Sequence, residues 1–204
     1  MAVALGGNLT LATGEYSLAQ GPFARATNFG SIAFGSLLTS SGYFSYAQGV
    51  EVSSSGEYSW ASGMGAYATG DYSTARGTGA TASGRSALAI GEWVYSQSYA
   101  EAVFGRYNST ITTSPTTWVA TDALFRVGNG SSSTDKSDAV TVLKNGKMTV
   151  TNKAWKANAS SPLADPTAAD DSGGSALEVD GHTKLNGKVE ISVPQGDISM
   201  GIYQ

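Results

Sequence analysis

The first hundred or so residues alternate small and larger side chains within short segments, and the segments recur every fourteen residues. Alternation with a period of two is typical of a β-strand, in which successive side chains point to opposite faces. In "GEYSWASG" and "GDYSTARG", the glycines, the tyrosine, the serine and the alanine return at the same places fourteen residues later. Each segment is too short to be stable as an isolated hairpin. The pattern therefore predicts stacked coils, each with two short strands and two corners, in which every strand pairs with the coils above and below.

Two series of glycines mark the repeat. The first series is Gly21, Gly35, Gly49, Gly63, Gly77, Gly91 and Gly105. The second, half a period away, is Gly14, Asn28, Gly42, Gly56, Gly70, Gly84 and Ser98. Because glycine and asparagine adopt a positive φ more readily than other residues, we predict that the second series occupies left-handed corners.

The coil interior is predicted to hold very small side chains. An alanine lies two residues before each of the first six glycines of the first series: Ala19, Ala33, Ala47, Ala61, Ala75 and Ala89. Burying one methyl group contributes about 0.8 kcal/mol, whereas ordering the backbone of one residue costs roughly 1–2 kcal/mol. One chain of such coils is therefore predicted to need further apolar burial on its outer faces.

Larger apolar residues alternate with these alanines and so point outward. They are Leu18, Ile32, Tyr46, Trp60, Thr74 and Leu88, with Phe34, Ile90 and Phe104 beside them. Large apolar residues repeated along an outer face are typical of a contact surface. We predict that this face mediates self-association into a cyclic homo-oligomer.

The segments "SIAFGSLLTSSG", "GTGATASGRSALAIG" and "SALAIGEWVYSQS" resemble the head repeats of trimeric autotransporter adhesins, the YadA-like heads, over about residues 11–107. The resemblance implies an all-β fold, a left-handed parallel β-roll, with three rolls side by side in a homotrimeric fibre. The valine and isoleucine columns of that family here also contain Tyr46, Gln48, Trp60 and Arg76, so the contact between subunits is predicted to be less uniformly apolar.

The region from Asp122 to Val150, "DALFRVGNGSSSTDKSDAVTVLKNGKMTV", resembles segments of phage tail fibres. Its alternation predicts strands over 123–127, 139–143 and 147–150, with a tight turn at Asn145–Gly146. We therefore expect a roll over 1–107, a β-rich connector over 108–155, a linker over 156–175 and a short β module over 176–204.

Charge and composition exclude several partners. The net charge of −4 argues against nucleic acid as a partner, and no apolar run approaches the roughly 18–20 residues that would insert into a membrane. The N-terminus shows neither the basic nor the long apolar region of a signal peptide. The resemblances instead imply an extracellular place, on a cell surface or on a phage or tailocin particle.

Candidate catalytic and metal-binding residues are few, so we expect no enzymatic activity, no cofactor and no metal. The chain has no cysteine and one histidine, His182, which argues against zinc sites and against Ser-His-Asp or Cys-His catalysis. The glycines of "GMGAYATG" mostly fall on the repeat and lack the lysine of a phosphate loop. Acidic side chains that could bind calcium or pair as glycosidase carboxylates are expected to be solvated instead. They are Asp135, Asp138, Asp165, Asp170 and Asp171, together with Glu92 and, in one corner column with Arg85, Glu15, Glu57 and Asp71.

An aromatic column is the strongest candidate for a binding surface. It contains Tyr16, Phe44, Tyr58 and Tyr72. These rings either pack between subunits or form an exposed strip for a cell-surface glycan or protein receptor. The function predicted first is a non-enzymatic homotrimeric fibre or adhesin that displays a multivalent surface. The alternatives are a purely structural spacer and a polysaccharide-degrading tail spike.

Overall fold

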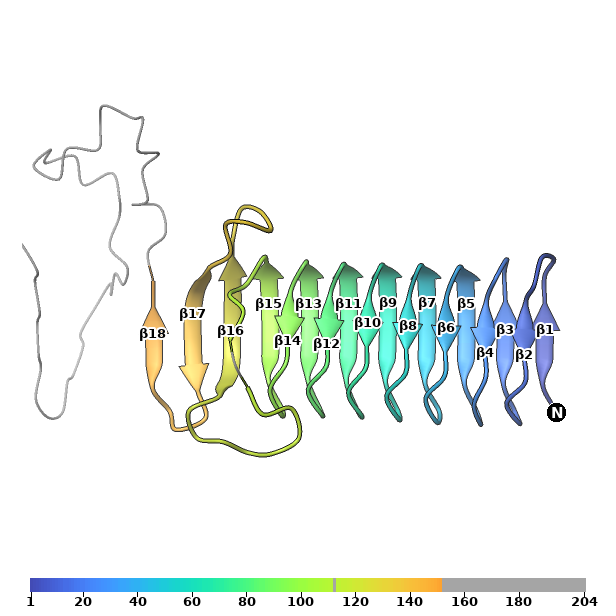
Figure 1. Ribbon diagram of the computed structural model, residues 1–204, viewed down its shortest axis with the longest axis horizontal. Helices are drawn as coiled ribbons and strands as arrows, with labels where there is room; N and C mark the ends of the chain where they lie inside the picture. Colours follow the sequence, from blue (N-terminus) through green and yellow to red (C-terminus); the bar gives the residue numbers. More distant parts are fainter. Residues whose placement is uncertain (112, 152–204) are drawn as a thin grey trace, which may run out of the picture.

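The computed structural model describes residues 1–111 and 113–151, and these residues form an all-β parallel solenoid of about seven turns. Figure 1 shows the coils as a regular stack, with the N-terminus at one end and β16 to β18 at the other. The predicted linker at 156–175, the module at 176–204, His182, Asp165, Asp170 and Asp171 lie outside the described residues. The left-handed winding and the trimer stay predictions.

Two sheets form the two sides of the coils, and strands of neighbouring coils pair in parallel in both. The longer sheet contains β1 (Val3–Leu5), β3 (Leu18–Gln20), β5 (Ile32–Ser36), β7 (Tyr46–Val50), β9 (Trp60–Met64), β11 (Thr74–Thr78), β13 (Leu88–Glu92), β15 (Ala102–Arg106), β16 (Ala123–Asn129), β17 (Asp138–Leu143) and β18 (Met148–Val150). The shorter sheet contains β2 (Leu11–Ala12), β4 (Arg25–Ala26), β6 (Thr39–Ser40), β8 (Ser53–Ser54), β10 (Tyr67–Ala68), β12 (Thr81–Ala82) and β14 (Tyr95–Ser96).

Equivalent residues of neighbouring coils are hydrogen-bonded neighbours, as the fourteen-residue period predicts. Ala61 of β9 pairs with Ala47 of β7 on one side and with Ala75 of β11 on the other. The alanines of this column, Ala19, Ala33, Ala47, Ala61, Ala75 and Ala89, are all fully buried. The interior therefore consists mainly of methyl groups stacked in files along the axis of the solenoid.

Serine hydroxyls fill most of the remaining interior space. Ser45 is buried, and its Oγ lies 2.7 Å from Oγ of Ser40 and donates to the carbonyl of Gly42 at 2.8 Å. Ser59, Ser54 and Gly56 repeat the arrangement one coil later. Most buried hydroxyls in proteins are hydrogen-bonded, and at Ser45 and Ser59 the turn carbonyl provides the acceptor within the same coil. The buried hydroxyl of Ser73, in the same column, has no such partner within residues 1–111 and 113–151.

The prediction of left-handed corners at the second glycine series is wrong. Gly42 and Gly56 do not have a positive φ; that conformation occurs two residues later, at Phe44 (φ 50°) and Tyr58 (φ 53°). Glycine is required at Gly56 because a Cβ would lie 2.0 Å from the carbonyl oxygen of Gly70. The second series therefore marks the close approach of successive backbones rather than a left-handed conformation.

The first glycine series combines both constraints. Gly49 has a φ of 126°, and a Cβ there would lie 1.9 Å from the carbonyl oxygen of Gly63. Only a residue without a side chain fits this column, so it stays glycine from coil to coil.

The longer sheet continues beyond residue 107, where the sequence predicted the end of the roll. β16 pairs in parallel with β15, with Gly105 opposite Gly128, and β17 and β18 follow as antiparallel strands. The predicted strands over 123–127, 139–143 and 147–150 correspond to these three, and the predicted turn contains Gly146 with a φ of 85°.

Candidate interaction surfaces

The aromatic column lies at one corner of the coils and is exposed. Tyr16 is 61% exposed, and Phe44, Tyr58 and Tyr72 are between 47% and 49% exposed. All four have a positive φ, between 50° and 58°. We call these four residues the corner ladder.

Most rings of the corner ladder stack on one another. The rings of Tyr58 and Tyr72 are nearly parallel, with centroids 5.4 Å apart, and Phe44 stacks on Tyr58 at 5.7 Å. The guanidinium carbon of Arg85 lies 5.6 Å from the centre of the Tyr72 ring. Because these ring faces are occupied within the chain, a ligand would meet mainly ring edges and the hydroxyls of Tyr58 and Tyr72.

The acidic residues beside the corner ladder are exposed and make local contacts. Asp71 Oδ1 accepts a hydrogen bond of 3.0 Å from the backbone N–H of Glu57 in the preceding coil. Glu15 lies in the same column and is also exposed. The prediction that Asp138 is solvated is wrong: only 10% of its side chain is exposed, because it lies beside the buried Arg126. Its Oδ1 accepts a hydrogen bond from the backbone N–H of Ser109 at 3.1 Å, so its carboxylate helps to fix the chain beyond β15.

Asp135 also has a local role, because its carboxylate accepts a hydrogen bond from the hydroxyl of Ser131 in the loop between β16 and β17. Among the described residues, no group of three or more histidine or acidic side chains is arranged to hold a metal ion.

The outer face of the longer sheet is largely apolar and has aromatic contacts between coils. The rings of Tyr46 and Trp60 meet edge to face at 5.8 Å, and Phe34 meets Tyr46 at 6.1 Å. A hollow of about 470 Å³ lies between this face and the corner ladder, lined by Phe44, Tyr46, Tyr58, Ser59 and Trp60. We call the outer surface of the longer sheet the broad face.

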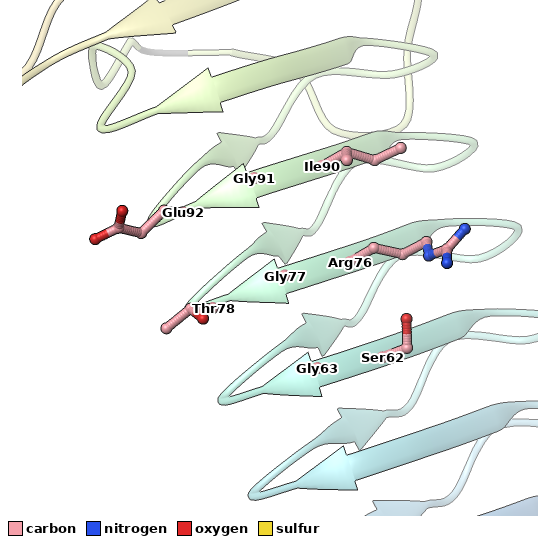
Figure 2. Close-up of a pocket in the computed structure, with 8 residues that line it drawn as sticks. All are labelled: Ser62, Gly63, Arg76, Gly77, Thr78, Ile90, Gly91 and Glu92. Carbon is pink, nitrogen blue, oxygen red and sulfur yellow. The ribbon is translucent and has the colours of Figure 1, made fainter.

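A second, shallow hollow lies on the broad face around Arg76. Figure 2 shows Arg76 projecting from β11, with Ser62 on the strand to one side and Ile90 on the strand to the other. Gly63, Gly77 and Gly91 cross its floor without side chains, and Thr78 and Glu92 lie at its edge. The guanidinium carbon of Arg76 lies 5.1 Å from the centre of the Trp60 ring.

A buried ion pair at the C-terminal end of the coils was not predicted from the sequence. Arg126 Nε donates to Glu101 Oε1 at 2.6 Å, and both side chains are fully buried. The second carboxylate oxygen, Oε2, accepts from the backbone N–H groups of Gln97 and Ser98, at 2.7 and 2.9 Å. Arg126 Nη1 also lies 3.5 Å from Asp138 Oδ2. This network closes the interior where the column of alanines ends.

Asn108 closes the free edge of the shorter sheet in a similar way. Its Oδ1 accepts from the backbone N–H of Tyr95 at 2.7 Å, and its Nδ2 donates to the carbonyl of Tyr95 at 3.0 Å. In the coil before, the N–H of Thr81 bonds to the carbonyl of Val94. The Asn108 side chain therefore takes the place of the backbone of a further coil.

The family model for the YadA head domain repeat matches two segments, residues 12–37 and 68–91. No curated protein and no solved structure matches the chain. The match supports the resemblance of the solenoid to YadA-like heads, and none of the comparisons supports the resemblance of residues 122–150 to tail fibres.

The described residues contain no helix of the length and apolar character that crossing a membrane requires.

Proposed function

We propose that the chain is part of a non-enzymatic homotrimeric fibre or adhesin head, in which three solenoids pack side by side through the broad face. The supporting observation is the contrast between the interior and this face. The interior is made of alanine, serine and a few aliphatic side chains such as Leu38 and Val52, whereas Tyr46, Trp60 and Phe104 point outward. Association of three copies would bury the apolar surface that the interior does not provide.

In this proposal the fibre attaches to a host or cell surface. Three copies would display three corner ladders in parallel, and repeated weak contacts would give a high overall avidity. The receptor class is a surface glycan or protein. The match to YadA head repeats supports an adhesin-like role. An extracellular location, on a cell surface or on a phage or tailocin particle, belongs to the same proposal.

The alternative is a purely structural spacer, and the stacking within the corner ladder favours it. Phe44, Tyr58, Tyr72 and Arg85 already contact one another, so the ladder has a structural role without any ligand. A polysaccharide-degrading spike is the third possibility, for which Glu57 and Asp71 are the nearest pair of acidic residues in the corner column.

Light scattering tests the assembly, and cell binding tests the attachment. A mass of three chains is expected, and a stable single chain would refute the fibre.

For the adhesin, Tyr58→Ala and Tyr72→Ala are expected to weaken binding to cells or to a glycan array while the trimer persists. Unchanged binding in an intact trimer would leave the spacer as the better description. Thr69→Ala, an exposed position directly after β10 of the shorter sheet, is the matched control.

A further inference from the structure

Arg76 is the single charged residue of its outward column on the broad face; Arg106, at the end of β15, also lies on this face but pairs with Glu92. Its column on this face otherwise contains Gln20, Phe34, Gln48, Ser62, Ile90 and Phe104. The neighbouring outward column contains no charged residue between Leu18 and Ala102. Among the described residues Arg76 forms no ion pair, and its guanidinium group lies over the ring of Trp60.

The nearest acidic residue on this face already has a partner. Glu92 lies at the edge of the Arg76 hollow, but its Oε2 is 2.9 Å from Arg106 Nε in the next coil. Within the described part of the chain, the hollow therefore has no free carboxylate in position to neutralise Arg76. A charge that is buried without neutralisation is strongly unfavourable.

Threefold symmetry would bring three copies of this charge together. In a trimer whose axis runs along the stack, each coil lies level with the same coil of the other two chains. Three Arg76 side chains would then converge at the level of β11. Ser62 is small and Gly63, Gly77 and Gly91 have no side chains, so the hollow leaves space beside each guanidinium group.

We propose that three Arg76 side chains, one from each chain, form a binding site for a small inorganic oxyanion within the trimer. This inference rests on the proposed homotrimer and on its packing through the broad face. Guanidinium groups bind oxyanions with two parallel hydrogen bonds, and the hydroxyls of Ser62 and Thr78 are further donors at the same hollow. The Trp60 ring, 5.1 Å from the guanidinium carbon, holds Arg76 by a cation–π contact.

Sulfate is the probe for the test, because it is a small inorganic oxyanion that can be added at a defined concentration. Titration of the wild-type trimer with sodium sulfate, followed by calorimetry at constant ionic strength, is expected to show one site per three chains. The midpoint of thermal unfolding should rise by several degrees when sulfate replaces chloride. Sulfate also stabilises proteins in general, so the wild type is compared with Arg76→Ile, which introduces the residue found at the equivalent position of the next coil, Ile90. This variant should lose the part of the rise in the unfolding midpoint that comes from sulfate bound at the site.

Matched variants separate this site from a general effect of sulfate and from an ion pair between chains. Arg25→Ile removes an exposed arginine from the shorter sheet and should keep the full sulfate response. In buffer without oxyanions, Arg76→Ile is expected to unfold at a higher temperature than the wild type, because three clustered charges are removed. If Arg76 instead paired with Glu92 of a neighbouring chain, Arg76→Ile and Glu92→Gln would both destabilise the trimer.

The outcomes distinguish the inference from the proposed function. A single chain in solution would refute the trimer and the anion site together. A trimer that binds no sulfate, or an Arg76→Ile trimer that binds it equally well, would refute the anion site alone. Should Arg76→Ile fail to fold, the titration of the wild-type trimer still decides.

Discussion

Arg126 and Glu101 form a fully buried ion pair, 2.6 Å between Nε and Oε1, at the end of an interior made mainly of alanine and serine side chains. Arg126 occupies the alanine column, because it pairs with Val103 in the register of β15 and β16. Glu101 occupies the column of Ser45 and Ser59. Two large side chains of opposite charge thus fill the end of the solenoid.

Removing one partner of this pair should be strongly destabilising. Arg126→Val leaves the Glu101 carboxylate buried without its cation, which costs about 3–5 kcal/mol in comparable buried pairs. Chemical denaturation of the variant should show the loss. Replacing both residues by those of the preceding coil, Glu101→Ala with Arg126→Val, is expected to cost clearly less than the sum of the single changes. Additive losses would show that the two side chains do not act as a pair.

Asn108 should protect the edge of the shorter sheet. Asn108→Ala removes both hydrogen bonds to the backbone of Tyr95. The carbonyl of Tyr95 keeps the hydrogen bond from Arg126 Nη2 at 2.9 Å, so the cost of about 1–3 kcal/mol comes from the N–H of Tyr95, which is left unsatisfied. The specific measurement is hydrogen exchange at the amide of Tyr95, which should become faster, while the amide of Thr81, bonded to Val94, keeps its protection. Equal exchange at Tyr95 in both proteins would contradict this role.

The repeat made the solenoid predictable, and the end of the repeat made its closure difficult to predict. Ala61 and Trp60 could be assigned to opposite faces because alternation holds in every coil. The step from β15 to β16 does not keep the fourteen-residue spacing, since Val103 pairs with Arg126. The signal was nevertheless present: Arg126 lies two residues before Gly128, the position that alanine takes in the coils.

The left-handed residues were misassigned for a physical reason. The second glycine series was expected to have a positive φ. Glycine is instead required at Gly42 and Gly56 because the backbone of the next coil lies too close for a Cβ. The positive φ falls on Phe44 and Tyr58, where composition gives no signal. Stacking between coils favours large aromatic residues at those positions. The residue types there therefore do not indicate a positive φ.

Two glycine substitutions should separate close approach from conformation. Gly56 has no positive φ, yet Gly56→Ala is expected to abolish folding, because the new Cβ would lie 2.0 Å from the carbonyl oxygen of Gly70. Gly7→Ala is the control, since a Cβ there has no atom within 4 Å and Gly7 has no positive φ. That variant should be neutral or more stable by up to about 1 kcal/mol. Circular dichroism with thermal unfolding is the measurement.

The interior should not accept a larger side chain. Ala61 is fully buried between Ala47 and Ala75, so Ala61→Leu forces coils apart. Overpacking commonly costs about 1–3 kcal/mol, and here the strain would be passed to both neighbouring coils. We expect little folded protein, measured by solubility and thermal unfolding. Thr69→Leu adds a similar volume on an exposed position and should fold normally; a normal unfolding curve for Ala61→Leu would count against the packed interior.

The corner ladder should show how stacking offsets an unfavourable backbone conformation. Tyr58 has a φ of 53° and stacks on Phe44 and Tyr72. Tyr58→Ala removes both stacks, each worth about 0.5–1.5 kcal/mol beyond area burial, but keeps the left-handed conformation on a residue with a Cβ. Tyr58→Gly loses the same stacks and relieves that conformation, which costs non-glycine residues roughly 1–2 kcal/mol. We therefore expect Tyr58→Gly to unfold at a higher denaturant concentration than Tyr58→Ala, although glycine is normally the more destabilising substitution. The opposite order would mean that the positive φ at this corner costs little and that the ladder has no backbone strain to offset.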